Sequence, residues 1–145
     1  FKEEIRMLQK SDVISELLSQ LNNKLKFLNQ NLESAIISRN SDTKSSAGDK
    51  FETSREMAQI EIRKLETEIL KAQQFIQDLQ ENKADLIITE TEVFLISIPF
   101  GKITINSKTI YCISNSAPIS KLLLNTEIST GFNYRGVDYK VVSKS

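Results

Sequence analysis

Two long stretches of the chain place hydrophobic residues at alternating steps of four and three positions. The first follows Ile14, Leu18, Leu21, Leu25, Leu28, Leu32 and Ala35, and the second follows Ala58, Ile62, Leu65, Ile69, Ala72, Ile76 and Leu79. Polar and charged residues fill most positions between them. This spacing aligns the hydrophobic side chains in one narrow seam, which suits pairing with a single other helix, as in a coiled coil.

A short polar stretch, Arg39–Phe51, separates the two seams. Two helices with such seams, joined by about ten residues, most simply fold back on each other as an antiparallel hairpin. We therefore expect residues 1–83 to form an antiparallel coiled-coil hairpin whose tip lies near residues 40–50. At about 1.5 Å per residue, arms of about thirty residues make a rod of roughly 45 Å.

The composition changes near Glu81–Asp85, after which Ile, Thr, Val, Tyr and Phe become frequent. These residues favour strands. The expected strands are Leu86–Thr89, Glu92–Ile98, Lys102–Ile105, Thr109–Ser114, Phe132–Arg135 and Asp138–Ser143. A short helix is expected at Ala117–Leu124, because Pro118 stands near its start. The pattern predicts an α+β chain in which residues 84–145 form a small antiparallel sheet covered by one short helix.

Composition and charge narrow the possible functions. Hydrophobic residues make up 39% of the chain, below the share of about 45–50% in typical globular domains, as a long hairpin with a narrow seam would require. Basic and acidic residues number 19 each, and 13 of the basic and 14 of the acidic residues precede residue 84. Two nearly neutral halves argue against a mainly electrostatic grip on nucleic acid.

Few residues that commonly carry chemistry are present. The chain has no histidine, and its one cysteine, Cys112, lies in an expected strand. A lone cysteine fits a reducing, cytoplasmic setting and a buried structural role. No nucleophile–base pair, metal-ligand cluster or glycine-rich phosphate loop stands out, and no apolar run reaches the roughly 18 residues that a membrane span needs. A free-standing enzyme is therefore not expected.

Two motifs resemble a known family. The segment 45–52, Ser-Ser-Ala-Gly-Asp-Lys-Phe-Glu, resembles the hairpin tip of the Gre-type transcript cleavage factors of bacterial RNA polymerase, which contains the run Leu-Ser-Glu-Asn-Ala-Glu-Tyr. The segment 113–124 resembles the family's Ile-Ser-x-x-Ser-Pro-Ile-Ala-Arg-Ala-Leu-Leu. Residues 131–142 match the family's last two strands in outline, and the order of hairpin and sheet also matches.

The resemblance implies a monomeric accessory factor with an FKBP-like C-terminal domain. In the family, this domain docks on RNA polymerase, and the hairpin enters the polymerase secondary channel. Acidic residues at the tip then help to hold a Mg²⁺ ion shared with the polymerase active site, which promotes hydrolysis of backtracked RNA. Nascent RNA would be contacted only indirectly, and no membrane is involved.

The tip departs from the family pattern. When the chain is aligned on Phe51, the family's acidic pair falls on Lys44 and Ala47, and neither can ligate Mg²⁺ as a carboxylate does. The acidic candidates nearby are Asp42 and Asp49. Each is a candidate ligand of the shared Mg²⁺, but an acid in the first turn of a helix, such as Asp49, can equally serve as a capping residue. Stimulation of cleavage and inhibition of the polymerase both stay open.

The resemblance also implies a docking segment. Its candidate polymerase-binding residues are Ser116, Pro118, Ile119 and Lys121, and Lys121 keeps the positive charge of the family's Arg. Ala117 replaces the family's Ser. Alternatively, Pro118 only starts a helix whose Ile119 and three following leucines, Leu122–Leu124, pack on the sheet, and we expect that role for the leucines.

Two other functions deserve comparison. The hairpin seam alone would also suit a coiled-coil module that oligomerises or binds another helix. An FKBP-like domain could suggest prolyl isomerase activity, but that activity needs a deep aromatic pocket, and fold alone does not carry function.

Overall fold

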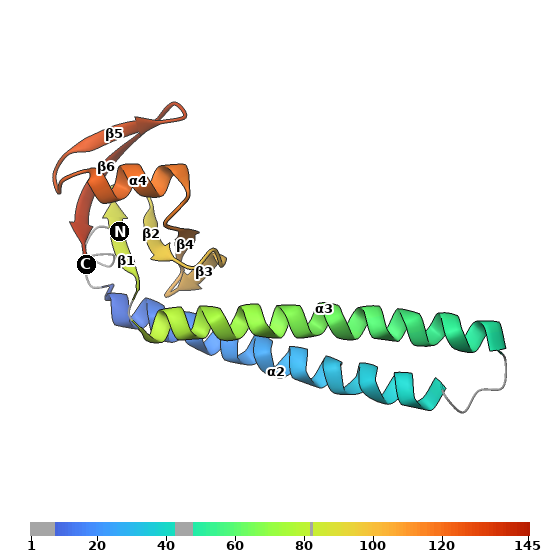
Figure 1. Ribbon diagram of the computed structural model, residues 1–145. Coiled ribbons are helices and arrows are strands. Elements are labelled where there is room, and N and C mark those ends of the chain that lie inside the picture. The colour runs from blue at the N-terminus through green and yellow to red at the C-terminus, as the bar shows by residue number, and fades with distance from the viewer. Residues whose placement is uncertain (1–7, 43–47, 82) are drawn as a thin grey trace. The chain divides into compact units, whose positions relative to one another are not determined.

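The structure, a computed structural model, describes residues 8–42, 48–81 and 83–145, without the side chains of residues 42 and 48–52. Two long helices come first, α2 (Lys10–Asp42) and α3 (Gly48–Gln80). The remaining elements are β1 (Asp85–Thr89), β2 (Val93–Ser97), β3 (Gly101–Ile105), β4 (Lys108–Ser114), α4 (Pro118–Asn125), β5 (Gly131–Tyr134) and β6 (Val137–Lys144) (Figure 1). The predicted α+β class is confirmed, and each predicted strand and the short helix begin and end within one residue of the observed bounds.

The chain divides into two compact units. The helical unit is Gln20–Ile76, and the sheet unit combines the start of α2, up to Ser19, with Gln77–Ser145. In the part of the chain that the structure describes, no helix is both long and apolar enough to cross a membrane.

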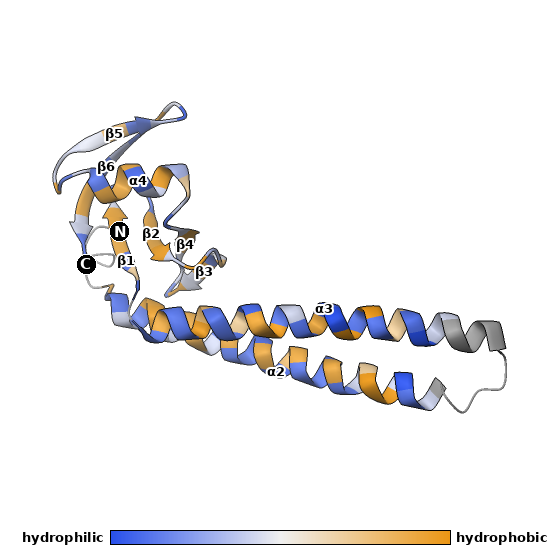
Figure 2. Cartoon of the chain, in the orientation of Figure 1, coloured by the Kyte–Doolittle hydropathy of each residue, from blue (hydrophilic) through white to orange (hydrophobic). Residues whose placement is uncertain are grey.

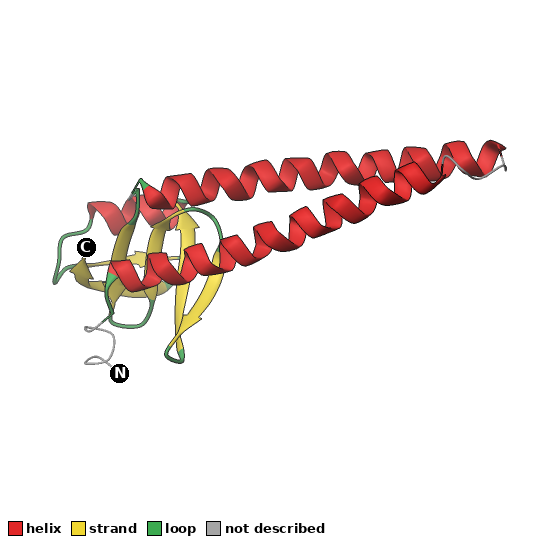
Figure 3. Cartoon of the chain, turned by 90° about the horizontal axis from the view of Figure 1, so that it is seen from below, coloured by secondary structure: helices red, strands yellow, loops and turns green. Residues whose placement is uncertain are grey.

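In the helical unit, the predicted seam is buried between α2 and α3, which run side by side (Figure 3). Leu28, Leu65, Ile69 and Ala72 form a buried cluster, against which Leu25, Leu32 and Ala35 pack. Hydrophobic and hydrophilic residues alternate along both helices (Figure 2). Each helix has 33 residues, which corresponds to a length of about 50 Å. One chain therefore supplies both sides of the seam.

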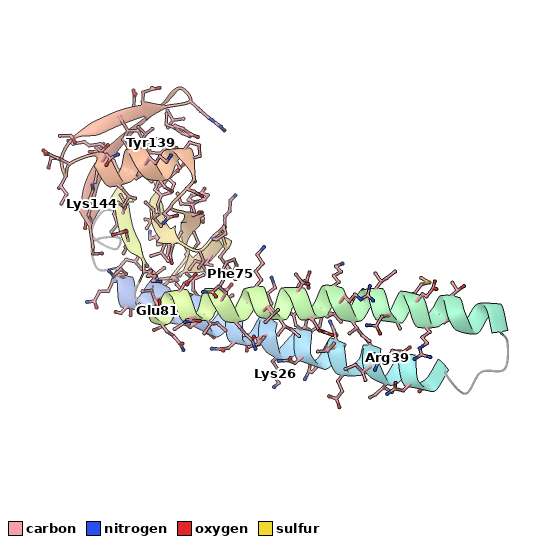
Figure 4. All side chains as sticks on the ribbon, in the orientation of Figure 1. Lys26, Arg39, Phe75, Glu81, Tyr139 and Lys144 are labelled. Carbon is pink, nitrogen blue, oxygen red and sulfur yellow. The ribbon has the colours of Figure 1, made fainter. Side chains whose placement is uncertain are left out.

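A polar link continues the seam towards the end of α2. Arg39 follows Ala35 by four positions, and its side chain is half-buried. Arg39 lies towards the end of α2 (Figure 4), and its Nη1 donates a hydrogen bond to Oε1 of Gln59 in α3 at 3.1 Å. A polar residue at a seam position fixes the register of two paired helices at some cost in stability.

The start of α2 buries more than the predicted seam. Val13 and Leu17 are fully buried, whereas the predicted Ile14 and Leu18 are only half-buried. This stretch belongs to the sheet unit, so more than a single partner helix surrounds it. A pattern read for two paired helices therefore misses Val13 and Leu17.

The sheet unit contains a six-stranded mixed sheet with the order β3-β4-β2-β1-β6-β5. β2 and β4 are parallel, with Leu95 opposite Cys112, and the other neighbouring pairs are antiparallel. The prediction of a purely antiparallel sheet is therefore wrong at this pair. The reason is that β3 forms the edge of the sheet and pairs with β4, which returns between β3 and β2.

Both faces of the sheet are buried. On one face, Ile87, Phe94, Ile96, Tyr139 and Val141 form a core cluster with Leu123 of α4. The residues that alternate with them on the central strands are buried too: Leu86, Ile88, Val93, Leu95, Ile110 and Cys112. Helix α4 packs on the first face. The start of α2 and the end of α3 belong to the same compact unit and also contribute buried side chains, among them Val13, Leu17 and Leu79. Burial of both faces accounts for the near-continuous hydrophobic runs of β1 and β2.

Two tight turns connect antiparallel strands. Asn106 and Ser107, with φ of 50° and 66°, join β3 to β4, and Arg135 and Gly136, with φ of 51° and 81°, join β5 to β6. Positive φ at both central residues is typical of the type I′ turn, whose twist matches that of the flanking strands. The predicted hairpin at residues 106–108 and the predicted turn at Gly136 are therefore confirmed.

Candidate functional site

The four candidate docking residues lie in and just after the turn that joins β4 to α4. Ser116, Pro118 and Lys121 are exposed. Ile119 is half-buried and packs against the core cluster under α4. Three of the four side chains are thus available to a partner, whereas Ile119 contributes mainly to the packing of the helix.

A network of hydrogen bonds shapes this turn, Ser114–Pro118, which we call the serine turn. The carbonyl of Ser114 accepts hydrogen bonds from the Ala117 N–H at 3.1 Å and from the Ser120 hydroxyl at 2.6 Å. The Ser114 hydroxyl accepts one from the Ser116 N–H at 3.2 Å and lies 2.9 Å from the Ser116 hydroxyl. An ordered backbone therefore presents Ser116 and Pro118.

Helix α4 begins without a side-chain cap. Its N-cap residue is Ala117, with extended backbone (φ −64°, ψ 141°) and no side chain that can accept a hydrogen bond. Ser120, in the first turn, is fully buried and ties that turn back to the end of β4 through its hydroxyl. Ser120 was not predicted as functional, and the available signal was a serine placed three residues after an alanine that cannot cap.

The outer surface of α4 is more hydrophobic than predicted. Leu123 is fully buried, but Leu122 and Leu124 are 37% and 38% exposed. The prediction that all three leucines are core residues is therefore wrong for two of them, because an eight-residue helix buries only one narrow face. Here that face holds the buried Ser120 and Leu123 and the half-buried Ile119. Exposed Leu122 beside Lys121 makes this surface both hydrophobic and basic.

The tip of the hairpin lies mostly outside the described residues. Asp42 is the last residue of α2 and Asp49 is the second residue of α3, but neither side chain is described. Lys44 and Ala47, where the family has its acidic pair, lie outside the described residues altogether. Within residues 8–42, 48–81 and 83–145, no group of three or more histidine, cysteine, aspartate or glutamate side chains is found that could hold a metal ion. The Mg²⁺ ligands at the tip thus stay predictions.

Cys112 is a structural residue, as predicted. It is free, and only 1% of it is exposed. Burial raises the pKa of its thiol to about 12. Because the thiolate is the reactive form, such a thiol is a poor nucleophile near neutral pH.

Aromatic side chains on the α4 side of the sheet pack on one another. The rings of Phe132 and Tyr139 are stacked with centroids 5.4 Å apart, and Phe94 meets Tyr139 edge-on at 6.0 Å. Burial, assisted by the Glu92 carboxylate, raises the pKa of Tyr139. Phe94 and Tyr139 fill the core under α4 together with Leu123, and Phe132 packs against this cluster. Phe132 and Tyr139 also line a cavity of about 440 Å³ at the surface of the sheet unit.

A polar cavity of about 620 Å³ in the sheet unit borders the serine turn at Asn115, and its lining also includes Lys10, Asp78, Lys83, Asp85 and Ser97. Lys10 Nζ donates to the Ala84 carbonyl at 3.2 Å. Charges of both signs line the cavity, so it favours neither anionic nor cationic ligands. Its residues come from separate segments of the chain, near residues 10, 78–85, 96–97 and 115, so no local pattern predicts it.

No protein-family model, curated protein or solved structure matches the chain. The resemblance to the Gre-type factors therefore rests on the sequence motifs and on the order of the elements.

Proposed function

We propose that the chain is a Gre-like transcription elongation factor, an accessory protein that binds bacterial RNA polymerase through its sheet unit. Its helical hairpin would enter the secondary channel and modulate the active centre. One observation carries the proposal: two 33-residue helices packed along their own seam precede a sheet unit in which a helix beginning at Pro118 follows a serine turn. A sheet with one short helix packed on it is compatible with an FKBP-like domain.

The dimensions of the hairpin suit this role. Each helix is about 50 Å long and, with its side chains, about 10–12 Å in diameter. Because the seam is buried within one chain, the hairpin needs no second copy and stays two helices thick. A slender hairpin of this length can reach the bottom of a narrow channel.

The tip residues favour modulation over cleavage. In two-metal hydrolysis, carboxylates hold the second ion and orient the attacking water. Lys44 and Ala47 stand where the family has these carboxylates, and only Asp42 and Asp49 lie nearby as substitutes. A factor that occupies the channel without supplying a metal ligand would change substrate or RNA access rather than hydrolyse RNA.

The direct test uses backtracked elongation complexes of the cognate bacterial polymerase with Mg²⁺. We expect the protein to bind these complexes without shortening the RNA. Absence of binding would overturn the proposal. Shortening of the RNA would instead assign a metal role to the tip, and Asp42→Asn and Asp49→Asn would then identify which carboxylate provides it.

A second candidate function is a protein-interaction or oligomerisation module. It is favoured by large hydrophobic side chains that lie outside the seam and are 58–67% exposed: Phe27, Ile37, Met57, Ile60 and Leu70. Such residues could contact another protein along the outer surfaces of the hairpin. Light scattering separates the two functions, because the module predicts dimers or tetramers and the elongation factor predicts a monomer.

A further inference from the structure

Ser120 occupies a position in α4 where a hydroxyl has little other reason to be. It is fully buried. Two other residues of the same helix, Ile119 and Leu123, pack in the hydrophobic core. A buried hydroxyl is unfavourable unless it is hydrogen-bonded. Here it donates to the Ser114 carbonyl at 2.6 Å, across six residues of chain. The hydroxyl therefore links the first turn of α4 to the end of β4.

We propose that Ser120 is the positioning residue of the docking segment. Its bond to Ser114 fixes the path of the serine turn and so sets where Ser116, Pro118 and Lys121 stand. The proposal rests on the proposed function, since it assumes that these exposed residues contact the polymerase. Ser120 itself is buried and touches no partner.

The missing cap of α4 explains why this residue is needed. An N-cap serine would accept a hydrogen bond from an N–H of the first helical turn and hold the turn against the helix. Ala117 cannot do so. In the motif that the segment resembles, serine stands at position 117 and alanine at position 120, which is the reverse of this chain. In both sequences, one of the two positions 117 and 120 carries a hydroxyl that can connect the turn and the helix.

The reversed arrangement defines a set of variants. Ser120→Ala removes the link, and Ala117→Ser combined with Ser120→Ala moves the hydroxyl to the cap. Thr89→Val is the matched control, because Thr89 is also buried in the sheet unit and its hydroxyl donates to the Glu92 carbonyl at 2.8 Å, outside the serine turn. Polymerase affinity, urea unfolding and amide hydrogen exchange at Ser116 and Ala117 are measured for each protein.

We expect Ser120→Ala to weaken polymerase binding about tenfold, equivalent to ~1.4 kcal/mol, and to speed exchange at the Ala117 amide, which bonds to Ser114. The double variant should restore the affinity, and Thr89→Val should leave it unchanged even where it lowers stability.

Separate results overturn the positioning role and the proposed function. Unchanged hydrogen exchange at the Ala117 amide in Ser120→Ala overturns the positioning role. An equal loss of polymerase affinity in Thr89→Val overturns it too, because the loss would then follow from lower stability alone. Failure of the wild-type protein to bind polymerase overturns the proposed function, while the exchange data still decide whether Ser120 orders the turn.

Discussion

Among the residues that the structure describes, four buried side chains of the sheet unit carry a polar or ionisable group: Thr89, Cys112, Ser120 and Tyr139. The hydroxyls of Thr89 and Ser120 donate to backbone carbonyls at 2.8 and 2.6 Å, so hydrogen bonds offset the cost of burying them. A thiol is only a weak hydrogen-bond donor. The consequence of burying Cys112 therefore lies mainly in its ionisation.

Because Cys112 is buried, we expect the folded protein to lose stability in alkaline solution. Burial raises the pKa of its thiol from 9.0 to about 12. Between these pH values the unfolded chain releases a proton that the folded chain keeps, so the free energy of unfolding falls as the pH rises above 9.0. Below the unfolded pKa, the thiol is neutral in both states and makes no such contribution.

Urea unfolding at about pH 8 and about pH 10.5 measures this effect. Wild-type protein should lose more stability between the two conditions than Cys112→Ala, which has no thiol to ionise. All other residues are the same in the two proteins, so their contributions cancel in the comparison. Equal losses would show that the environment of Cys112 does not disfavour its thiolate.

At the scale of elements, the two long helices depend on a seam that differs sharply from their outer surfaces. Leu65 and Leu70 lie in the same helix, α3, yet they are 4% and 67% exposed. Leu65→Ala should lower the free energy of unfolding by about 2–5 kcal/mol, through lost burial and a cavity. Leu70→Ala should change it by no more than about 0.5 kcal/mol. Urea unfolding of both variants provides the measurement, and similar effects would contradict the assignment of the seam.

The polar link across the hairpin predicts a measurable coupling. Arg39 and Gln59 share one hydrogen bond at 3.1 Å in a partly buried position, so the double variant Arg39→Ala/Gln59→Ala should lose less stability than the two single variants added together. We expect a coupling of about 0.5–1 kcal/mol. A control cycle pairs Gln59→Ala with Lys26→Ala, since Lys26 lies on α2, 13 positions from Arg39, and should show none. Additive effects in the first cycle would mean that the bond contributes nothing to stability.

Elements whose signals are local could be predicted from the sequence. Strand bounds were correct within one residue, because β-branched runs and the turn residues Asn106, Ser107 and Gly136 mark them directly. The parallel pairing of β2 with β4 depends on where β3 lies, and no local pattern reports it. Burial of Val13 and Leu17 depends in the same way on the rest of the sheet unit.

In the candidate site too, features that depend on local sequence could be predicted, and features that depend on the folded structure could not. Pro118 at the start of a helix and exposed Lys121 could be predicted, because each depends on short-range sequence. The bond from Ser120 to Ser114 depends on the angle between β4 and α4, and the exposure of Leu122 depends on which helix face meets the sheet. Both require the folded structure. The tip carboxylates Asp42 and Asp49 stay predictions from the sequence alone.

At the scale of the whole molecule, the proposed function assigns separate tasks to the two units. The sheet unit would bind the polymerase through the serine turn and α4, and the helical unit would carry the tip into the channel. Metal chemistry would then depend on the tip alone. A carboxylate pair placed at the family's positions should confer RNA cleavage without any change to the docking residues.

The double variant Lys44→Asp/Ala47→Glu tests this separation. If the hairpin reaches the active centre, the new carboxylates can hold the second Mg²⁺ and its water. We expect cleavage of backtracked RNA to accelerate by at least about tenfold, or ~1.4 kcal/mol in activation free energy, with unchanged affinity for the polymerase. The matched control, Lys44→Asn/Ala47→Gln, has nearly the same shape without the charges and should not cleave. Unchanged cleavage by the acidic variant, despite binding, would mean that the tip does not reach the active centre, because the metal ligands would then be present but misplaced.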